Sequence, residues 1–108
     1  LRPCLAQKGL LILTLTARGR AAHAARPHLG DNAVTRLARD LVRLDALAFS
    51  RIDPLLGPVT ATATMAHAGT AKNSVPDHAT ATIDVRSTPA YTHAELAALV
   101  DDALDSTV

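Results

Sequence analysis

Three side chains in this chain of 108 residues could act together on a small polar substrate: an imidazole, an amide and a guanidinium. The imidazole belongs to His23, which stands between two pairs of alanines and has room to project. An imidazole so placed can donate a hydrogen bond to a developing oxyanion. The ordinary alternative is a surface histidine, which is the more common use of a residue in such a place.

The amide and the guanidinium belong to Asn73 and Arg86, which could hold a substrate. The Asn73 amide could bind a carboxylate or an amide, although asparagine also occurs in turns for its backbone tolerance. The Arg86 guanidinium suits bidentate recognition of a carboxylate. Its alternative is a pair with Asp84 on the same face of a strand, which the spacing favours at least as much. Both substrate roles therefore stay open on the residues alone.

No metal site is predicted within the chain. His28 follows His23 by five residues, which is not the spacing of a helical pair, and no third ligand accompanies them. The remaining histidines lie near the ends of predicted elements and are expected to be surface or capping residues. No Ser-His-Asp arrangement, glycine-rich phosphate loop or carboxylate cluster is present. The chain alone therefore lacks a complete active site.

Composition excludes several classes of partner. A formal net charge of +1 and only two aromatic residues, Phe49 and Tyr91, argue against nucleic acid. Cys4 is the single cysteine, which excludes an internal disulfide and a cysteine-based zinc site. No apolar run approaches the roughly 20 residues of a membrane span. Because the chain begins at Leu1 without an initiator methionine, we expect a piece of a longer protein.

Hydropathy patterns predict three strands and two helices. In the first strand Leu11, Leu13 and Leu15 fall on one face and polar residues from position 14 onward on the other, while the beginning of the strand is apolar on both faces. Two later stretches alternate more strictly. Thr92 and Glu95 form a capping-box pattern before the second helix. The expected strands cover 9–18, 59–68 and 78–87, and the expected helices extend to about 47 and over about 93–104.

The first helix is expected to begin after Asp31 or Asn32, either of which is a plausible cap. Its apolar stripe indicates the buried face, and the charged residues opposite are expected to be solvated. The stripe consists of Val34, Leu37, Ala38, Leu41, Leu44 and Ala48, and the charged face of Arg36, Arg39, Asp40 and Arg43.

The element order predicts an α+β fold of the split β-α-β (ferredoxin-like) type. We expect an antiparallel sheet of three to four strands with two helices on one face. Residues 105–108 are too few to predict the fourth strand, so its presence stays open.

Several motifs together resemble the dimerisation ("lid") domain of the zinc-dependent aminoacylase and carboxypeptidase family. Members include acetylornithine deacetylase, succinyl-diaminopimelate desuccinylase and glutamate carboxypeptidase. The resemblance covers about residues 8–104. The motifs are Lys8-Gly9, Gly19-x-x-x-His23-x-x-x-Pro27-x-x-Gly30-x-Asn32-Ala33, Asn73-Ser74-Val75-Pro76-Asp77 and Asp84-Val85-Arg86 with Pro89 after it.

This resemblance implies a role for the whole chain. Residues 1–108 would be a dimerisation and lid domain, inserted into a catalytic domain of the same polypeptide that binds two zinc ions and supplies a glutamate as general base. His23 matches the histidine that reaches into the partner's site and stabilises the oxyanion. Asn73 and Arg86 match residues that hold the substrate, with the arginine on its carboxylate. The isolated chain would bind no zinc and be inactive.

The implied activity is removal of an N-acyl group from an amino acid by a cytoplasmic homodimer. We expect a deacetylase of the acetylornithine or acetyl-lysine type, acting in amino-acid biosynthesis. The expected dimer surface combines the first helix with the edge strand over 59–68. The alternative is a stand-alone ferredoxin-like module that binds a ligand or a protein without catalysis.

Overall fold

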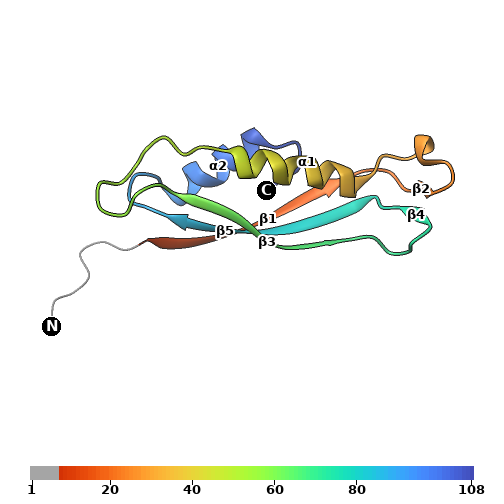
Figure 1. Ribbon diagram of the computed structural model, residues 1–108, viewed down its shortest axis with the longest axis horizontal. Coiled ribbons are helices and arrows are strands. Elements are labelled where there is room, and N and C mark those ends of the chain that lie inside the picture. The colour runs from red at the N-terminus through yellow and green to blue at the C-terminus, as the bar shows by residue number, and fades with distance from the viewer. Residues whose placement is uncertain (1–7) are drawn as a thin grey trace.

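The computed structural model describes residues 8–108, which form an antiparallel sheet covered on one face by two helices (Figure 1). This arrangement confirms the expected α+β fold. The sheet has the order β1-β5-β3, with β5 in the centre. Cys4 lies outside the described residues. The strands are β1 (Gly9–Arg18), β3 (Thr60–Ala68) and β5 (His78–Ser87).

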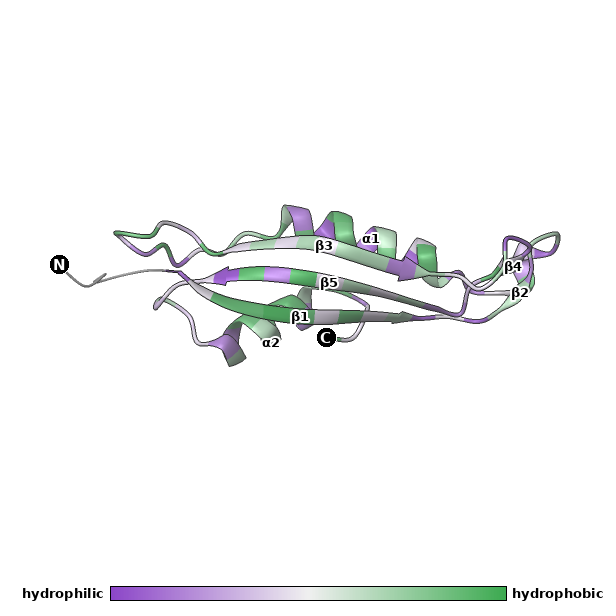
Figure 2. Cartoon of the chain, turned by 90° about the horizontal axis from the view of Figure 1, so that it is seen from below, coloured by the Kyte–Doolittle hydropathy of each residue, from purple (hydrophilic) through white to green (hydrophobic). Residues whose placement is uncertain are grey.

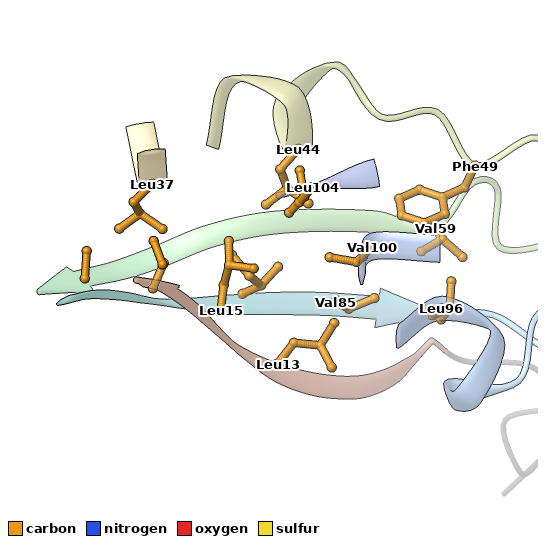
Figure 3. Close-up of a cluster of buried hydrophobic side chains, with 14 of the residues drawn as sticks. Leu13, Leu15, Leu37, Leu44, Phe49, Val59, Val85, Leu96, Val100 and Leu104 are labelled. Carbon is orange, nitrogen blue, oxygen red and sulfur yellow. The ribbon is translucent and has the colours of Figure 1, made fainter. Parts of the chain in front are cut away.

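Strands β1 and β5 pair along their whole length, from Gly9 opposite Ser87 to Arg18 opposite His78. Their alternation sends apolar side chains to the helix-covered face and mostly polar ones to the other. Figure 3 shows the resulting core between the sheet and the helices. Its members from these two strands are Leu13, Leu15, Ala17, Ala79, Ala81, Ile83 and Val85.

Helix α1 (Ala33–Ala46) is capped by Asn32, whose side-chain oxygen accepts a hydrogen bond from the Val34 backbone N–H at 2.9 Å. The predicted buried stripe is only partly right. Leu37 and Leu44 are buried, but Val34 is 43% exposed, and Ala38 and Ala48 are also exposed. The helix is turned so that the face of Ala33, Leu37, Asp40 and Leu44 meets the sheet.

Asp40 corrects the prediction that the charged face of α1 is solvated, because its side chain is fully buried. Its carboxylate accepts hydrogen bonds from the backbone N–H groups of Asp105 at 3.0 Å and Ser106 at 2.8 Å, and from the Ser106 hydroxyl. Arg43 pairs with it at 3.0 Å. Burial alone would raise the pKa of Asp40, but these hydrogen bonds outweigh burial and lower it. Helical periodicity could not predict this, because the partners come from the far end of the chain.

Helix α2 (His93–Ala103) begins with the predicted capping box. The Thr92 hydroxyl accepts from the Glu95 N–H at 3.1 Å, and the Glu95 carboxylate accepts from the Thr92 N–H at 2.9 Å. Leu96 and Val100 place its buried face in the core. Neither described helix has the length and hydropathy that a bilayer span requires.

The two edges of the sheet differ. On the β1 edge, Thr107 forms two backbone hydrogen bonds with Thr16, at 2.8 and 2.9 Å. This single bridge lies where a split β-α-β fold places its fourth strand, but residues 8–108 form no full strand there. On the other edge, β3 is exposed except for the half-buried Ala61, and its register with β5 shifts between Ala63 and Met65.

Candidate functional site

A second, two-stranded sheet stands at one end of the molecule; it includes one of the three candidate residues, and another directly precedes it (Figure 1). It consists of β2 (Ala22–His23) and β4 (Ser74–Val75), with His23 opposite Ser74. The Ala24 backbone N–H also donates to the Asn73 carbonyl at 2.9 Å. The structure therefore brings together His23 and Asn73, which are 50 residues apart in the sequence. We call this end, residues 19–31 with 69–77, the tip.

The His23 imidazole is oriented by its own turn. Its Nδ1 accepts a hydrogen bond from the Ala25 backbone N–H at 3.0 Å, and its carbonyl accepts from the Arg26 N–H at 2.8 Å. A ring nitrogen that accepts a hydrogen bond carries no proton, so the neutral ring holds its proton on Nε2. The exposed ring is then able to donate a hydrogen bond from Nε2, and its role as an oxyanion donor stays a prediction.

Two glycines allow the tip to close. The two ends of the loop are joined by an antiparallel bridge, in which Arg20 and Asp31 exchange backbone hydrogen bonds, both 2.8 Å long. A Cβ on Gly19 would lie 2.0 Å from the Asp31 carbonyl oxygen, and one on Gly30 would lie 2.8 Å from the Arg20 carbonyl oxygen. Only a residue without a side chain fits such close backbone contacts. Between these glycines lies a short 3-10 helix, η1 (Pro27–Leu29).

Arg86 does not join this site within the chain. It lies near the opposite end of β5, where it faces Leu10 on β1 and Thr60 on β3. Eight steps along the strand separate it from His78, about 26 Å at roughly 3.3 Å per residue. Its guanidinium makes a two-point contact with the Asp84 carboxylate, at 2.8 and 3.0 Å, as the alternative interpretation of this residue expected.

No metal centre forms within residues 8–108, because no three histidine, aspartate, glutamate or cysteine side chains come together there. The His23 Nδ1 is already engaged by Ala25. The sequence resemblance assigns the two zinc ions to a separate catalytic domain and none to these residues.

Two further basic residues lie at the tip. Arg26 closes the His23 turn, and Lys72 directly precedes Asn73. With Arg20 they make three basic residues at the tip, against the two acidic residues Asp31 and Asp77. The net charge of the tip therefore gave the sequence analysis no signal.

Comparison with protein families identifies the class of this domain. Residues 5–108 match the family model described as the peptidase dimerisation domain. The chain belongs to this family, as the sequence motifs predicted. The description of this family names dimerisation, that is, self-association of the domain.

Curated relatives are named as hydrolases. The chain is 35% identical over 100 residues to succinyl-diaminopimelate desuccinylase of Rhodospirillum centenum, which covers 92% of this chain and 26% of that protein. It is 39% identical over 90 residues to a protein named "Probable carboxypeptidase" from Aspergillus flavus, covering 75% of this chain and 21% of that protein. The chain thus spans about a quarter of the length of these relatives.

Solved structures share the fold. Aminopeptidase PepT from Bacillus cereus matches with a TM-score of 0.66 and 25% identity, covering 92% of this chain and 25% of that one. A putative aminohydrolase from Staphylococcus aureus matches with a TM-score of 0.70 and 21% identity, covering 98% and 30%.

Proposed function

We propose that this chain is the dimerisation and lid domain of a zinc-dependent hydrolase that removes an N-acyl group from an amino acid. In this proposal His23 of one subunit donates its Nε2–H to the oxyanion that forms in the active site of the partner. The orientation of the His23 ring, with Nδ1 held by Ala25, is the observation that carries the proposal. Membership of the dimerisation family and the hydrolase names of the relatives support it.

The chemistry follows from charge development at the scissile amide. Attack on the carbonyl carbon places a negative charge on the carbonyl oxygen, and a fixed donor stabilises that charge more than it stabilises the substrate. Loss of one such donor costs about 2.7–4 kcal/mol in other hydrolases. His23 suits this task because the turn from His23 to Arg26 and the pairing with Ser74 fix its backbone.

The separation of the candidate residues favours a site shared between subunits. His23 and Asn73 lie at the tip, whereas Arg86 lies near the other end of β5. A single small substrate cannot contact both ends of one chain, which are at least about 26 Å apart by strand length. If all three residues bind one substrate, two copies of the domain must contribute. Arg86 would leave Asp84 to hold the substrate carboxylate from one subunit, while His23 and Asn73 enter from the other.

The surface proposed for self-association combines α1 with the free edge of β3. Val34, Ala38 and Leu41 line a hollow together with Ala66 and Ala68 of β3. The side of α1 that was predicted to be buried, but is exposed, therefore places apolar side chains beside the edge of β3 that has no partner strand among the described residues. Such an edge can pair with a second strand, and pairing of two β3 strands would continue the sheet across a two-fold axis.

The remaining components lie in other parts of the proposed protein. Two zinc ions and the general base belong to a catalytic domain of the same polypeptide, and the zinc ions supply the activated water. A preference for acetylornithine or acetyl-lysine, a role in amino-acid biosynthesis and a cytoplasmic location stay predictions.

The test uses the full-length enzyme with His23→Ala, and His28→Ala as the matched control. We expect kcat to fall by about two orders of magnitude or more for His23→Ala, with zinc content and the dimer unchanged. His28→Ala, which removes an imidazole from η1 in the same loop, should leave kcat unchanged. An effect of His23→Ala confined to KM would contradict the oxyanion role.

A mixed dimer tests whether the donation occurs between subunits. One subunit carries His23→Ala and the other carries an inactivated general base in its catalytic domain. The His23→Ala homodimer should keep only the residual activity expected above, and the homodimer without the general base should be inactive. The mixed dimer should recover activity at one of its two sites, because the intact catalytic domain then faces an intact His23. A mixed dimer as inactive as its parents would show that His23 acts within its own subunit.

A further inference from the structure

Strand β3 is interrupted at its middle residue, Thr64, by a β-bulge. On the neighbouring β5, Ile83 lies opposite Ala63 and Thr82 lies opposite Met65, so Thr64 has no residue opposite it. The alternation of side chains between the two faces of the sheet therefore changes phase at Thr64. Residues directly opposite in a ladder share a face, and the β5 partners of four β3 residues are buried in the core. These four residues, which face the helices, are Ala61, Ala63, Ala66 and Ala68.

The change of phase restricts how two β3 edges can pair around a two-fold axis. An axis perpendicular to the sheet keeps each face on its own side, and opposite residues must share a face. When residues 60–63 pair with the partner's residues 65–68, Ala61 is opposite either the partner's Ala66 or the partner's Ala68. The register between these two would set Ala61 against the partner's His67, which lies on the open face with Thr80. Two registers therefore satisfy this pairing.

Helix α1 and β3 enclose two hollows, one on each side of the bulge. Figure 2 shows α1 and the outer strand β3 on the same side of the molecule. The first hollow contains Val42, which is 71% exposed, beside residues 61–63. The second contains Val34, which is 43% exposed, beside residues 66–68, and Leu41 lines both hollows. The apolar surface beside β3 thus continues along both halves of the strand.

The two hollows favour one pairing of the strand halves over the others. Pairing of residues 60–63 with the partner's own residues 60–63 would cover the first hollow and leave the second in water. Pairing of residues 65–68 with themselves would do the reverse. Reciprocal pairing places the first hollow of each copy beside the second hollow of the other. Because apolar surface is more stable out of water, the reciprocal arrangement gains the most from burial.

We infer that residues 60–63 of each subunit pair with residues 65–68 of the other, so that both bulges lie at the two-fold axis. The inference rests on the proposed function, which supplies a dimer formed through β3. The bulge and the two hollows supply the register. With the bulge at the axis, both halves keep their alanines on the helix-covered face of one continuous sheet.

This register brings together two candidate ends that one chain keeps apart. Arg86 is opposite Thr60 on the neighbouring strand, and Thr60 is then opposite the partner's His67 or the partner's Gly69, where β3 leads into the tip. Arg86 and the base of the partner's tip are two strand spacings apart, roughly 10 Å. Within one chain, β5 alone sets Arg86 about 26 Å from the tip. Arg86 of one subunit therefore shares an end of the dimer with the tip of the other, which carries the imidazole and the amide.

Disulfide trapping in the full-length enzyme tests the register, in a background that carries Cys4→Ser and has no other exposed cysteine. One variant combines Ala61→Cys with Ala66→Cys, and a second combines Ala61→Cys with Ala68→Cys. Directly opposite residues have Cα atoms about 4.5–5.5 Å apart, which a disulfide can bridge. Mild oxidation should therefore convert one of these variants to a covalent dimer on a non-reducing gel.

Matched controls place both cysteines in the same half of β3. Ala61→Cys with Ala63→Cys reports pairing of the first half with itself, and Ala66→Cys with Ala68→Cys does so for the second half. Neither control should form a covalent dimer. A covalent dimer from either control, or none from the two variants with one cysteine in each half, would overturn the inference.

A mixed dimer tests the consequence for the site. One subunit carries Arg86→Ala and the other carries His23→Ala. The inferred register gives one site both defects and leaves the other site intact, so the mixed dimer should retain wild-type activity at one of its two sites. If Arg86 and His23 of the same subunit served one site, each site would carry a defect. Activity as low as that of the two parent homodimers would therefore count against the register.

The register and the proposed function can fail separately. A kcat defect of His23→Ala without any disulfide between the two halves would leave the oxyanion role standing and remove the register. A normal kcat in His23→Ala would overturn the proposed function, whereas a disulfide between the halves would still establish the pairing of β3.

Discussion

The tip and the body of the domain are held together by different forces. In the body, the helices bury leucine, isoleucine and valine side chains against β1 and β5 (Figure 3). At the tip, Val75 is the only buried large hydrophobic residue among those described. The loops there are held together mainly by backbone hydrogen bonds and by the close packing of two glycines. The body thus supplies most of the stability, whereas the tip buries little apolar surface and leaves most of its side chains exposed to solvent.

The largest expected effect breaks the body. Leu15 is fully buried in β1, so Leu15→Ala removes packed methyl groups and leaves a cavity. We expect a loss of about 2–5 kcal/mol in the free energy of unfolding, measured by chemical denaturation. Leu10→Ala, in the same strand but 51% exposed, is the control and should cost far less. Similar losses at both positions would contradict the described core.

The next effect breaks the tip. Gly19→Ala places a Cβ against the Asp31 carbonyl and so disrupts the backbone hydrogen bonds between Arg20 and Asp31. We expect a loss of stability of about 1–3 kcal/mol, together with a fall in kcat, because the loop that orients His23 shifts. Hydrogen exchange of the Arg20 and Asp31 amides would report the opening directly.

The control for this variant is another glycine at the tip. Gly69 has a positive φ of 86°, but a Cβ there meets nothing within 4 Å. Gly69→Ala should cost only about 1–2 kcal/mol of backbone strain and spare kcat. If both variants lowered kcat equally, the backbone bridge between Arg20 and Asp31 would not be what orients His23.

The smallest effect sharpens the comparison through pH. The folded pKa of Asp40 lies below the ordinary value of 3.8, because hydrogen bonds from Ser106 and Asp105 outweigh burial. Its contribution to stability is therefore present above 3.8 and is lost as pH falls through the lower folded pKa. Asp40→Asn should cost about 1–3 kcal/mol at neutral pH and flatten the decline of stability below about pH 4.

Asp45→Asn is the matched control for this effect, because Asp45 is exposed on the same helix. It should leave both the stability at neutral pH and its decline in acid unchanged. Denaturation measured from pH 7 to pH 2 checks both variants. An acid decline of Asp40→Asn identical to that of wild type would mean that Asp40 does not titrate with folding.

Local patterns were enough to predict the main elements. The alternation in β1 and β5 marks a half-buried strand because side chains point to opposite faces in turn. The Thr92–Glu95 capping box depends on residues three apart, so it too is visible in the sequence. Strand β3 was predicted one residue too long at its start, at Val59, which instead packs in the core.

Features that depend on distant contacts could not be predicted from these patterns. Strands β2 and β4 have two residues each, too few for periodicity, and they form only because the two loops meet. The face of α1 that is buried includes Asp40, whose carboxylate accepts hydrogen bonds from residues 105–106 at the far end of the chain. The motif singled out His23, whose role stays a prediction, but the Ala25 N–H that bonds to its ring belongs to a residue with no polar side chain.

The central position of β5 has a geometric consequence for the proposed dimer. One end of this strand leads into the tip and the other carries Arg86, so its ten residues separate the two places to which the proposed function assigns substrate binding. Within one chain, the separation of the tip from Arg86 is set by the length of this strand, and inserting two residues would lengthen it by about 6.6 Å without reversing the faces.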